Sequence, residues 1–188
     1  MEQGAAAEEL EEYARVLDFL PTGKSSSLRS EPIAQLVGEN RFTLLEVVTK
    51  TKEINIGERV YIGKGERDKV MQIKARITYE DLTETAKNQL PIEIANIIKQ
   101  NEPRFVKLFN TAGPISMRLH ALELFPGIGK KHLEAIITAR EEKEFESFED
   151  ISKRVPPLQD PVKLLVARVI EELKGGSRFY ILARPYKT

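Results

Sequence analysis

Cysteine is absent from the 188-residue sequence, and so is tryptophan. Without cysteine the chain has no disulfides, no thiolate zinc site, no iron–sulfur cluster and no thiol nucleophile. Only two histidines are present, His120 and His132, and neither has acidic residues at the spacing of a metal site. We therefore expect neither a metal nor a cofactor, and the lack of cysteine fits a reducing, cytoplasmic location.

An excess of one charge is also absent, because Lys plus Arg and Asp plus Glu both number 29. Any contact with a polyanion must therefore come from a local basic patch. The longest uninterrupted apolar run, Phe179–Ala183, is far too short to span a membrane. Residues 1–12 are acidic and rich in alanine, unlike a signal peptide, and we expect them to form a solvated tail of a cytoplasmic protein.

Strand-like patterns dominate residues 13–82. They cover Tyr13–Leu20, Ile33–Val37, Arg41–Thr49, Arg59–Gly63 and Val70–Tyr79. In the last segment Met71 and Ile73 alternate with Lys74 and Arg76, which predicts one apolar and one polar face. Five short strands are too few for a two-sheet sandwich and favour a small OB-like β-barrel, with an SH3-like barrel as the competitor. We expect the strand-like residues 177–188 to complete this barrel.

Helical patterns occupy the rest of the chain, which makes the predicted class α+β. Residues 83–116 read as a helical connector in which Pro91 and Pro103 each open a short helix. Residues 117–176 read as an all-α domain of helices joined by short turns. Asp160, placed before Pro161, is a typical N-cap residue for its last helix.

The most informative segment is Leu122–Lys131, which we expect to join two amphipathic helices. Gly127 and Gly129 allow the positive-φ backbone of a tight turn, and Ile128 between them can fill the core beneath it. The helix that follows begins with free backbone N–H groups and with Lys130 and Lys131. A helix N-terminus carries about half a positive charge and favours a phosphate. The predicted phosphate-binding residues are Pro126, Gly127, Ile128, Gly129, Lys130 and Lys131.

This segment resembles the helix-hairpin-helix motif, whose hairpin reads apolar-Pro-Gly-Ile-Gly-Lys and which binds nucleic-acid backbones without reading bases. Phe145–Ile151 resembles the linker of the tandem form found in DNA-uptake receptors and repair proteins. The second hairpin, Val155–Pro161, departs from the pattern. Pro157 cannot take positive φ and has no N–H, and Asp160 places a negative charge where a phosphate would sit. We therefore expect the second hairpin to be structural and only the first to bind.

Two further properties are implied by resemblance. In helix-hairpin-helix proteins the first hairpin can hold a monovalent cation on carbonyl oxygens, which would here belong to Glu123, Phe125 and Ile128. The whole chain resembles the archaeal domain-of-unknown-function family 655, which pairs an OB-like barrel with a helix-hairpin-helix pair and is presumed to bind nucleic acid.

Other basic residues could extend the contact. Lys64, Lys74 and Arg76 belong to a stretch in which basic residues outnumber acidic ones, and a barrel face of this kind can follow a nucleic-acid strand. A solvated strand face is an equally good explanation of this pattern. The C-terminal end, which includes Arg168 and Arg184, is also basic.

We therefore predict a non-enzymatic protein that binds RNA or DNA without sequence specificity. The alternative is a protein–protein adaptor in a ribosomal or repair assembly, which the balanced charge and the altered second hairpin favour. An enzyme such as a nuclease or glycosylase is the third possibility, but no carboxylate cluster or Ser-His-Asp set supports it.

Overall fold

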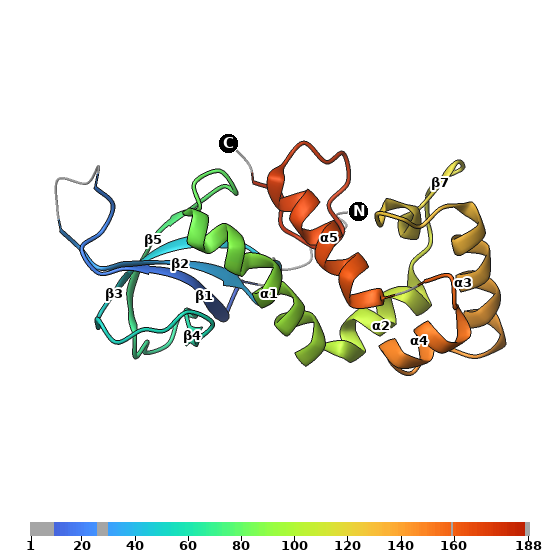
Figure 1. The fold of residues 1–188 in the computed structure, drawn as a ribbon, viewed down its shortest axis with the longest axis horizontal. Coiled ribbons are helices and arrows are strands. Elements are labelled where there is room, and N and C mark those ends of the chain that lie inside the picture. The colour runs from blue at the N-terminus through green and yellow to red at the C-terminus, as the bar shows by residue number, and fades with distance from the viewer. Residues whose placement is uncertain (1–9, 26–29, 159, 187–188) are drawn as a thin grey trace, which may run out of the picture. The chain divides into compact units, whose positions relative to one another are not determined.

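The protein is described by a computed structural model over residues 10–25, 30–158 and 160–186 (Figure 1). The chain divides into two compact units. The first contains the described residues up to Glu93, together with Leu173–Gly175 and the residues from Ala183 on. The second contains Ile94–Glu172 and Gly176–Leu182.

The first unit is built on a curled, five-stranded antiparallel sheet (Figure 1). Its strands are β1 (Tyr13–Leu20), β2 (Ile33–Gly38), β3 (Leu44–Thr49), β4 (Arg59–Tyr61) and β5 (Val70–Arg76). The strand order is β4-β1-β2-β3-β5, so β4 and β5 form the two edges. The sheet is therefore a half-barrel with two open edges.

Both faces of the central strands are buried. On one face Val16, Leu36 and Val47 belong to an apolar cluster inside the curl of the sheet. On the other face Gln35 donates to the carbonyl of Asp81 (3.0 Å) and accepts from the amide of Thr83 (2.9 Å), at the start of helix α1 (Glu84–Gln100). The two central strands β2 and β3 are consequently buried along their whole length.

Strand β5 departs from its predicted pattern. Met71 and Ile73 were expected to face the core, yet they are 57% and 41% exposed. Strand β5 pairs with β3 through two register shifts and has no second neighbour in the described sheet. Because an edge strand with bulges twists away from the core, its alternating pattern does not translate into one buried face.

The predicted C-terminal strand is absent, since residues 177–186 carry no strand. The amides of Ile181 and Leu182 donate to the buried carboxylate of Glu172 (2.9 and 3.0 Å), so they are not available to a sheet. Arg184 and Tyr186 contact the sheet region of the first unit without pairing as a strand. The Arg184 amide donates to the Arg41 carbonyl (2.9 Å). The Arg76 side chain donates to the Arg184 carbonyl (2.6 Å), and the Tyr186 hydroxyl donates to the Arg76 carbonyl (3.3 Å). The prediction that this segment completes the barrel is wrong.

Helix α1 begins earlier than predicted, and Pro91 lies inside it rather than at its start. The hydroxyl of Thr83 accepts the amide of Ala86 (3.0 Å) and donates to Asp18 (2.6 Å), so the helix is capped one residue before Glu84. The cap and the burial of Ala86 and Leu90 hold a helix that has lost one backbone hydrogen bond to proline.

The second unit contains the end of α1 and helix α2 (Glu102–Thr111), which has Pro103 in its first turn as predicted. A short hairpin follows, β6 (Pro114–Ser116) and β7 (Leu119–His120), and then one 3-10 turn, η1 (Ala121–Leu124). The segment before the glycine turn is therefore not the amphipathic α-helix that the sequence predicted. The remaining helices are α3 (Lys130–Glu142), α4 (Phe148–Arg154) and α5 (Pro161–Lys174).

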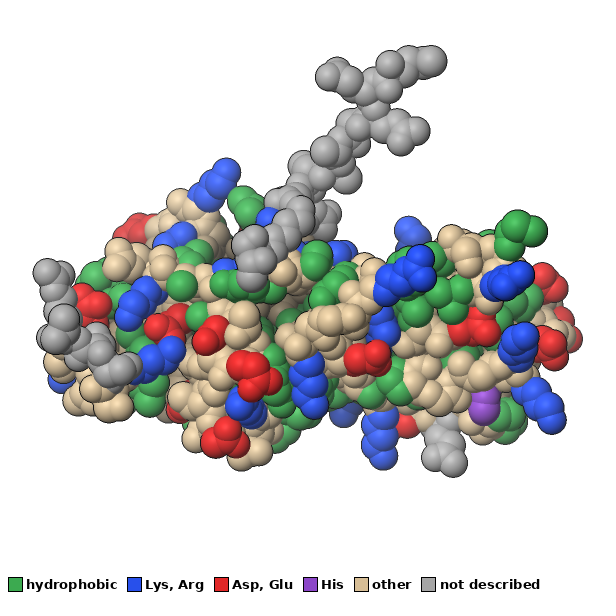
Figure 2. Space-filling view, turned by 90° about the horizontal axis from the view of Figure 1, so that it is seen from above, with side chains coloured by type: hydrophobic (Ala, Val, Ile, Leu, Met, Phe, Trp, Pro, Cys, Tyr) green, Lys and Arg blue, Asp and Glu red, His purple; other side chains and the backbone are tan. Residues whose placement is uncertain are grey.

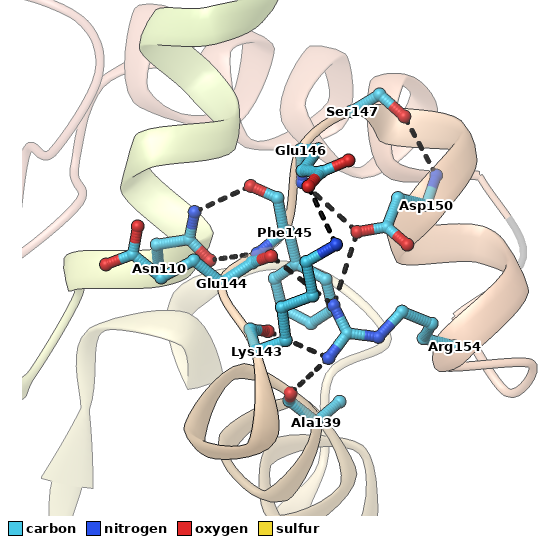
Figure 3. A network of polar contacts seen from close by, with 9 residues as sticks. All are labelled: Asn110, Ala139, Lys143, Glu144, Phe145, Glu146, Ser147, Asp150 and Arg154. Carbon is cyan, nitrogen blue, oxygen red and sulfur yellow. Dashed lines mark hydrogen bonds and ion pairs between the residues drawn. The ribbon is translucent and has the colours of Figure 1, made fainter.

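A polar network fixes the segment between α3 and α4 (Figure 3). Asn110 on α2 both accepts from the amide of Phe145 (2.8 Å) and donates to its carbonyl (2.9 Å). Arg154 on α4 donates to the carbonyls of Ala139 and Lys143 at the end of α3 (Figure 3). Ser147 caps α4 by accepting the amide of Asp150 (3.0 Å). These bonds link α2, the end of α3 and α4 through the segment that joins α3 to α4.

Candidate functional site

The turn between η1 and α3 has the features that the sequence predicted, with one difference. Gly127 has φ +88°, a conformation that side chains with a Cβ rarely adopt, whereas Gly129 has an ordinary extended backbone with φ −94°. The amide of Ile128 donates to the carbonyl of Phe125 (3.0 Å), which closes the turn. Phe125 and Ile128 are buried, while Pro126, Gly127 and Gly129 are exposed. Two apolar side chains thus anchor a turn whose backbone faces solvent.

The N-terminus of α3 is left uncapped by side chains. Gly129 is its N-cap residue and makes no side-chain hydrogen bond. The first bond within the helix runs from the Leu133 amide to the Gly129 carbonyl (3.0 Å). The amides of Lys130, Lys131 and His132 consequently have no acceptor within the helix. Lys130 and Lys131 are exposed, and no carboxylate in the described part of the chain lies within ion-pair distance of either.

The turn before α5 shares one backbone hydrogen bond with the turn before α3, but the helix start that follows it is occupied. The amide of Leu158 donates to the carbonyl of Val155 (2.8 Å), as Ile128 does to Phe125, and both apolar residues are again buried. However, the carboxylate of Asp160 accepts the amides of Val162 (3.0 Å) and Lys163 (3.3 Å) at the start of α5. The second helix N-terminus therefore already holds an anion, supplied by its own chain.

A buried arginine supports the base of the first turn. Arg168 on α5 is 3% exposed and donates to the carbonyls of Leu124 (3.1 Å) and Phe179 (2.6 Å). It also donates to the buried carboxylate of Glu172 (2.9 Å). Arg168 is therefore not part of a solvent-exposed basic C-terminal end. The sequence did not predict this buried role, because an arginine on an amphipathic helix is usually a surface residue.

The carbonyls suggested for a monovalent cation belong to Glu123, Phe125 and Ile128. The Phe125 carbonyl already accepts the Ile128 amide, and the guanidinium of Arg168 binds the adjacent carbonyl of Leu124. A resident positive charge at the base of the turn opposes a second cation beside it. The structure therefore gives this cation site no support of its own.

His120 fixes the start of η1 through a reciprocal capping box. Its Nδ1 accepts the amide of Leu122 (3.1 Å), and its own amide donates to the carboxylate of Glu123 (2.8 Å). Burial lowers the pKa of His120 below its usual value, and the nearby charge of Arg140 lowers it further, against the opposing effect of Glu123. The neutral imidazole is the form that can accept this hydrogen bond.

The other predicted basic residues belong to the first unit, so the candidate site is built from the turn alone. Lys64 is exposed, Lys74 lies 3.7 Å from the carboxylate of Glu46, and Arg76 donates to the carbonyl of Arg184 (2.6 Å). On the face drawn in Figure 2, basic and acidic side chains are interspersed. Lys74 and Arg76 are thus tied to neighbours within the unit, and Lys64 is the freest of the three.

The described residues have neither a metal-binding cluster nor a membrane-spanning helix. They contain no group of three His, Asp or Glu side chains arranged to hold a metal ion. Within the same residues, every helix is too short or too polar to cross a lipid bilayer. A shallow hollow of about 310 Å³ lies beside Asn110 and Phe145, and the network of Figure 3 forms part of its wall.

Comparison with known proteins gives one family. Residues 10–184 match the family described as "Protein of unknown function (DUF655)". The chain belongs to this family. It is 43% identical over 180 residues to the uncharacterized protein MJ0038 of Methanocaldococcus jannaschii, covering 94% of this chain and 82% of that protein. The resemblance to family 655 that the sequence suggested is confirmed.

A solved relative supports the fold. The crystal structure of Af1531 from Archaeoglobus fulgidus, also of this family, superposes with a TM-score of 0.87 at 50% sequence identity. The match covers 93% of this chain and all of that one. The α+β architecture of a half-barrel sheet and five α-helices is therefore shared within the family, while the chemistry of the site rests on the residues described above.

Proposed function

We propose that this protein binds RNA or DNA without reading sequence, by holding the phosphate backbone at the uncapped N-terminus of α3. The observation that carries the proposal is the contrast between the two turns. The amides at the start of α5 are occupied by Asp160, whereas Gly129 leaves those at the start of α3 free beside Lys130 and Lys131. Free helix-start amides with two unpaired lysines favour an anion with repeated negative charge.

The helix-hairpin-helix interpretation of the second unit belongs to this proposal. The similar turns before α3 and α5 support it, and the single 3-10 turn η1 in place of a first α-helix departs from it. The OB-like interpretation of the half-barrel is likewise proposed. Because the central strands are covered on both faces, the sheet can offer a ligand only its edges and loops. The turn before α3 is thus the main contact.

Exchange of the cap residue tests the proposal directly. Gly129→Asp gives α3 the carboxylate that α5 has in Asp160, and a Cβ at Gly129 meets no atom within 4 Å. We expect the variant to be as stable as the parent or more stable by a few tenths of a kcal/mol, since Asp is a good N-cap. Binding of a fluorescent oligonucleotide should weaken by about tenfold, because the carboxylate occupies the amides and repels phosphate.

Two controls separate the effect of the negative charge from the effect of filling the N-cap position. Gly129→Asn fills the same amides with a neutral side chain and should weaken binding less than the aspartate. Lys107→Glu places a negative charge on the exposed surface of α2, away from the turn, and should have only a small effect. Unchanged binding by a folded Gly129→Asp variant, for both RNA and DNA, would refute the proposal.

A protein–protein adaptor is the second candidate. The β6–β7 hairpin presents Ile115 and Met117 to solvent, and Met117 is fully exposed. Exposed apolar side chains at the tip of a hairpin are typical of a protein contact. A defined protein partner that remains bound after nuclease treatment, and is lost on Met117→Glu, would favour this function over nucleic-acid binding.

A further inference from the structure

The loop that joins β2 to β3 forms a pocket of backbone amides occupied by a carboxylate. Glu11 lies just before β1, and its Oε2 accepts the amide of Asn40 at 2.6 Å. Its Oε1 accepts the amides of Arg41 (2.7 Å) and Thr43 (3.1 Å). Three converging amides on two oxygens of one anion form the geometry known as a nest. Phe42 within the loop is buried and has φ +51°, which turns the neighbouring amides to the same side.

The loop is shaped around this side chain. A Cβ on Gly38 would lie only 2.1 Å from Cδ of Glu11, so the glycine leaves the space that the carboxylate occupies. The position before the turn thus accommodates an anion, and any side chain there would displace it. The φ of Gly38 is not positive, so its role is to leave space rather than to allow an unusual backbone.

The charges around the loop favour an anion as well. Glu39 in the same loop is paired with Arg15 (3.0 Å) and Arg59 (2.9 Å), which neutralise it. Arg41 belongs to the loop itself, and the amide of Arg184 bonds to its carbonyl. Arginines therefore outnumber carboxylates here once Glu11 is left out.

We propose that this nest, formed by the amides of Asn40, Arg41 and Thr43, is a second phosphate site, and that Glu11 is its internal stand-in. In the nucleic-acid complex that the proposed function requires, a backbone phosphate displaces Glu11 and takes its three amides. The tethered carboxylate competes at an effective concentration in about the millimolar range, so a single free phosphate displaces it poorly. A nucleic-acid strand presents many linked phosphates, so it competes with the tethered carboxylate better than a single free phosphate does.

The first experiment tests the nest without nucleic acid. Inorganic phosphate is titrated into ¹⁵N-labelled protein at constant ionic strength while the amide signals of Asn40, Arg41 and Thr43 are followed. Glu11→Ala removes the stand-in, and Gly38→Ala evicts it with no change of charge. Both variants should show saturable shifts of these three amides, at phosphate concentrations that leave the wild type and the Glu12→Ala control unchanged. Glu12 is the exposed neighbour and provides the matched loss of one carboxylate.

If Glu11→Ala and Gly38→Ala fold but their three amide signals do not shift with phosphate, the inference is overturned. Glu11 then has only a structural role. If Glu11→Ala does not fold, Glu11→Gln keeps the side chain but weakens the acceptor, and its amides should respond at lower phosphate than those of the wild type. No response in that variant overturns the inference equally.

The second experiment measures oligonucleotide binding, so that the nest and the proposed function can fail independently. Glu11→Ala and Gly38→Ala should bind a single-stranded oligonucleotide about threefold or more tightly than the wild type, and Glu12→Ala should gain less. Phosphate shifts without oligonucleotide binding by any variant would support the nest and contradict the proposed function. Equal oligonucleotide binding by all variants, with no phosphate shifts, would support the function and contradict the nest.

Discussion

Gly129 and Asp160 occupy the same position at the N-termini of two helices, and only Asp160 closes its site. Its carboxylate accepts two amides at the start of α5, whereas Gly129 offers the start of α3 no side-chain acceptor. The two turns that lead to these residues have the same backbone hydrogen bond and the same buried apolar anchors. The two helix starts therefore differ in one respect: the amides at the start of α5 have an acceptor from their own chain, and Gly129 provides none at the start of α3.

This relationship predicts that Asp160 contributes to stability and not to binding. Asp160→Ala leaves two helix-start amides without an acceptor, which typically costs about 1 kcal/mol. Urea unfolding should show this loss, while the affinity for an oligonucleotide should stay within about twofold of the wild type, because Pro157 leaves no tight glycine turn there. A large gain in affinity would mean that the second turn can also bind phosphate.

The sequence predicts much of the sheet and of the turn because both depend on local signals. Each of the five strands coincides, to within a few residues at its ends, with a strand-like segment of the sequence, and Gly127 takes the positive φ that its turn requires. The start of α1 was misplaced because its cap, Thr83, is held by Asp18, a contact made only in the folded unit. Pro91 is a local signal of a helix start, and this cap together with tertiary packing overrides it.

Two parts of the molecule were beyond prediction because a carboxylate from elsewhere in the chain accepts their backbone amides. The segment 177–186 has strand-like side chains, but Glu172 takes two of its amides. The Glu11 nest joins residues 29 to 32 positions apart and has no signature in the sequence. Hydrogen bonds from a carboxylate to backbone amides depend on the folded backbone, so no sequence pattern predicts them.

Lys130 should contribute one phosphate contact to binding and nothing to fold. Lys130→Ala is expected to weaken all oligonucleotide sequences about equally and to lower the slope of log K against log salt by about 0.9 for duplex DNA. Lys107→Ala removes another exposed lysine, on α2, and should leave the slope unchanged. Fluorescence titrations at several salt concentrations measure both quantities. A wild-type affinity that stays constant from low to moderate salt would contradict backbone binding altogether.

His120 should make the stability of the second unit depend on pH. Its folded-state pKa is lowered by burial and by Arg140, so the unfolded state binds the proton more readily. The stabilisation is fully present above the unfolded pKa of about 6.5 and is lost as the pH falls below it towards the folded pKa. Protonation also removes the acceptor for the Leu122 amide.

The measurement is urea unfolding between pH 5 and pH 8, where the free energy should fall on the acid side. His120→Asn retains a neutral acceptor that does not titrate and should flatten this part of the profile. His132→Asn, which replaces the other histidine on α3, is the matched control and should leave the profile as it is. If the free energy of unfolding of His120→Asn still falls on the acid side, the pH dependence arises from other titratable groups.

Arg168 should be the most costly single residue to remove from the second unit. Its side chain is buried and binds Glu172 and the carbonyls of Leu124 and Phe179. Arg168→Met leaves the Glu172 carboxylate buried without its cation, and loss of one partner of such a pair typically costs about 3–5 kcal/mol. Glu172→Gln keeps an oxygen for the Ile181 or Leu182 amide and should cost less.

The position of Arg168 at the base of the turn adds a functional consequence. Because it anchors the carbonyl of Leu124, Arg168→Lys should loosen the turn before α3 even where the unit stays folded, since an ammonium cannot reproduce the three separate bonds of the guanidinium. We expect faster hydrogen exchange at Gly127 and Ile128, and oligonucleotide binding weakened by a few-fold under conditions where circular dichroism shows a folded chain. Unchanged exchange and binding in Arg168→Lys would show that the turn holds its shape without this support, so that the buried side chains of Phe125 and Ile128 suffice to position the uncapped amides at the start of α3.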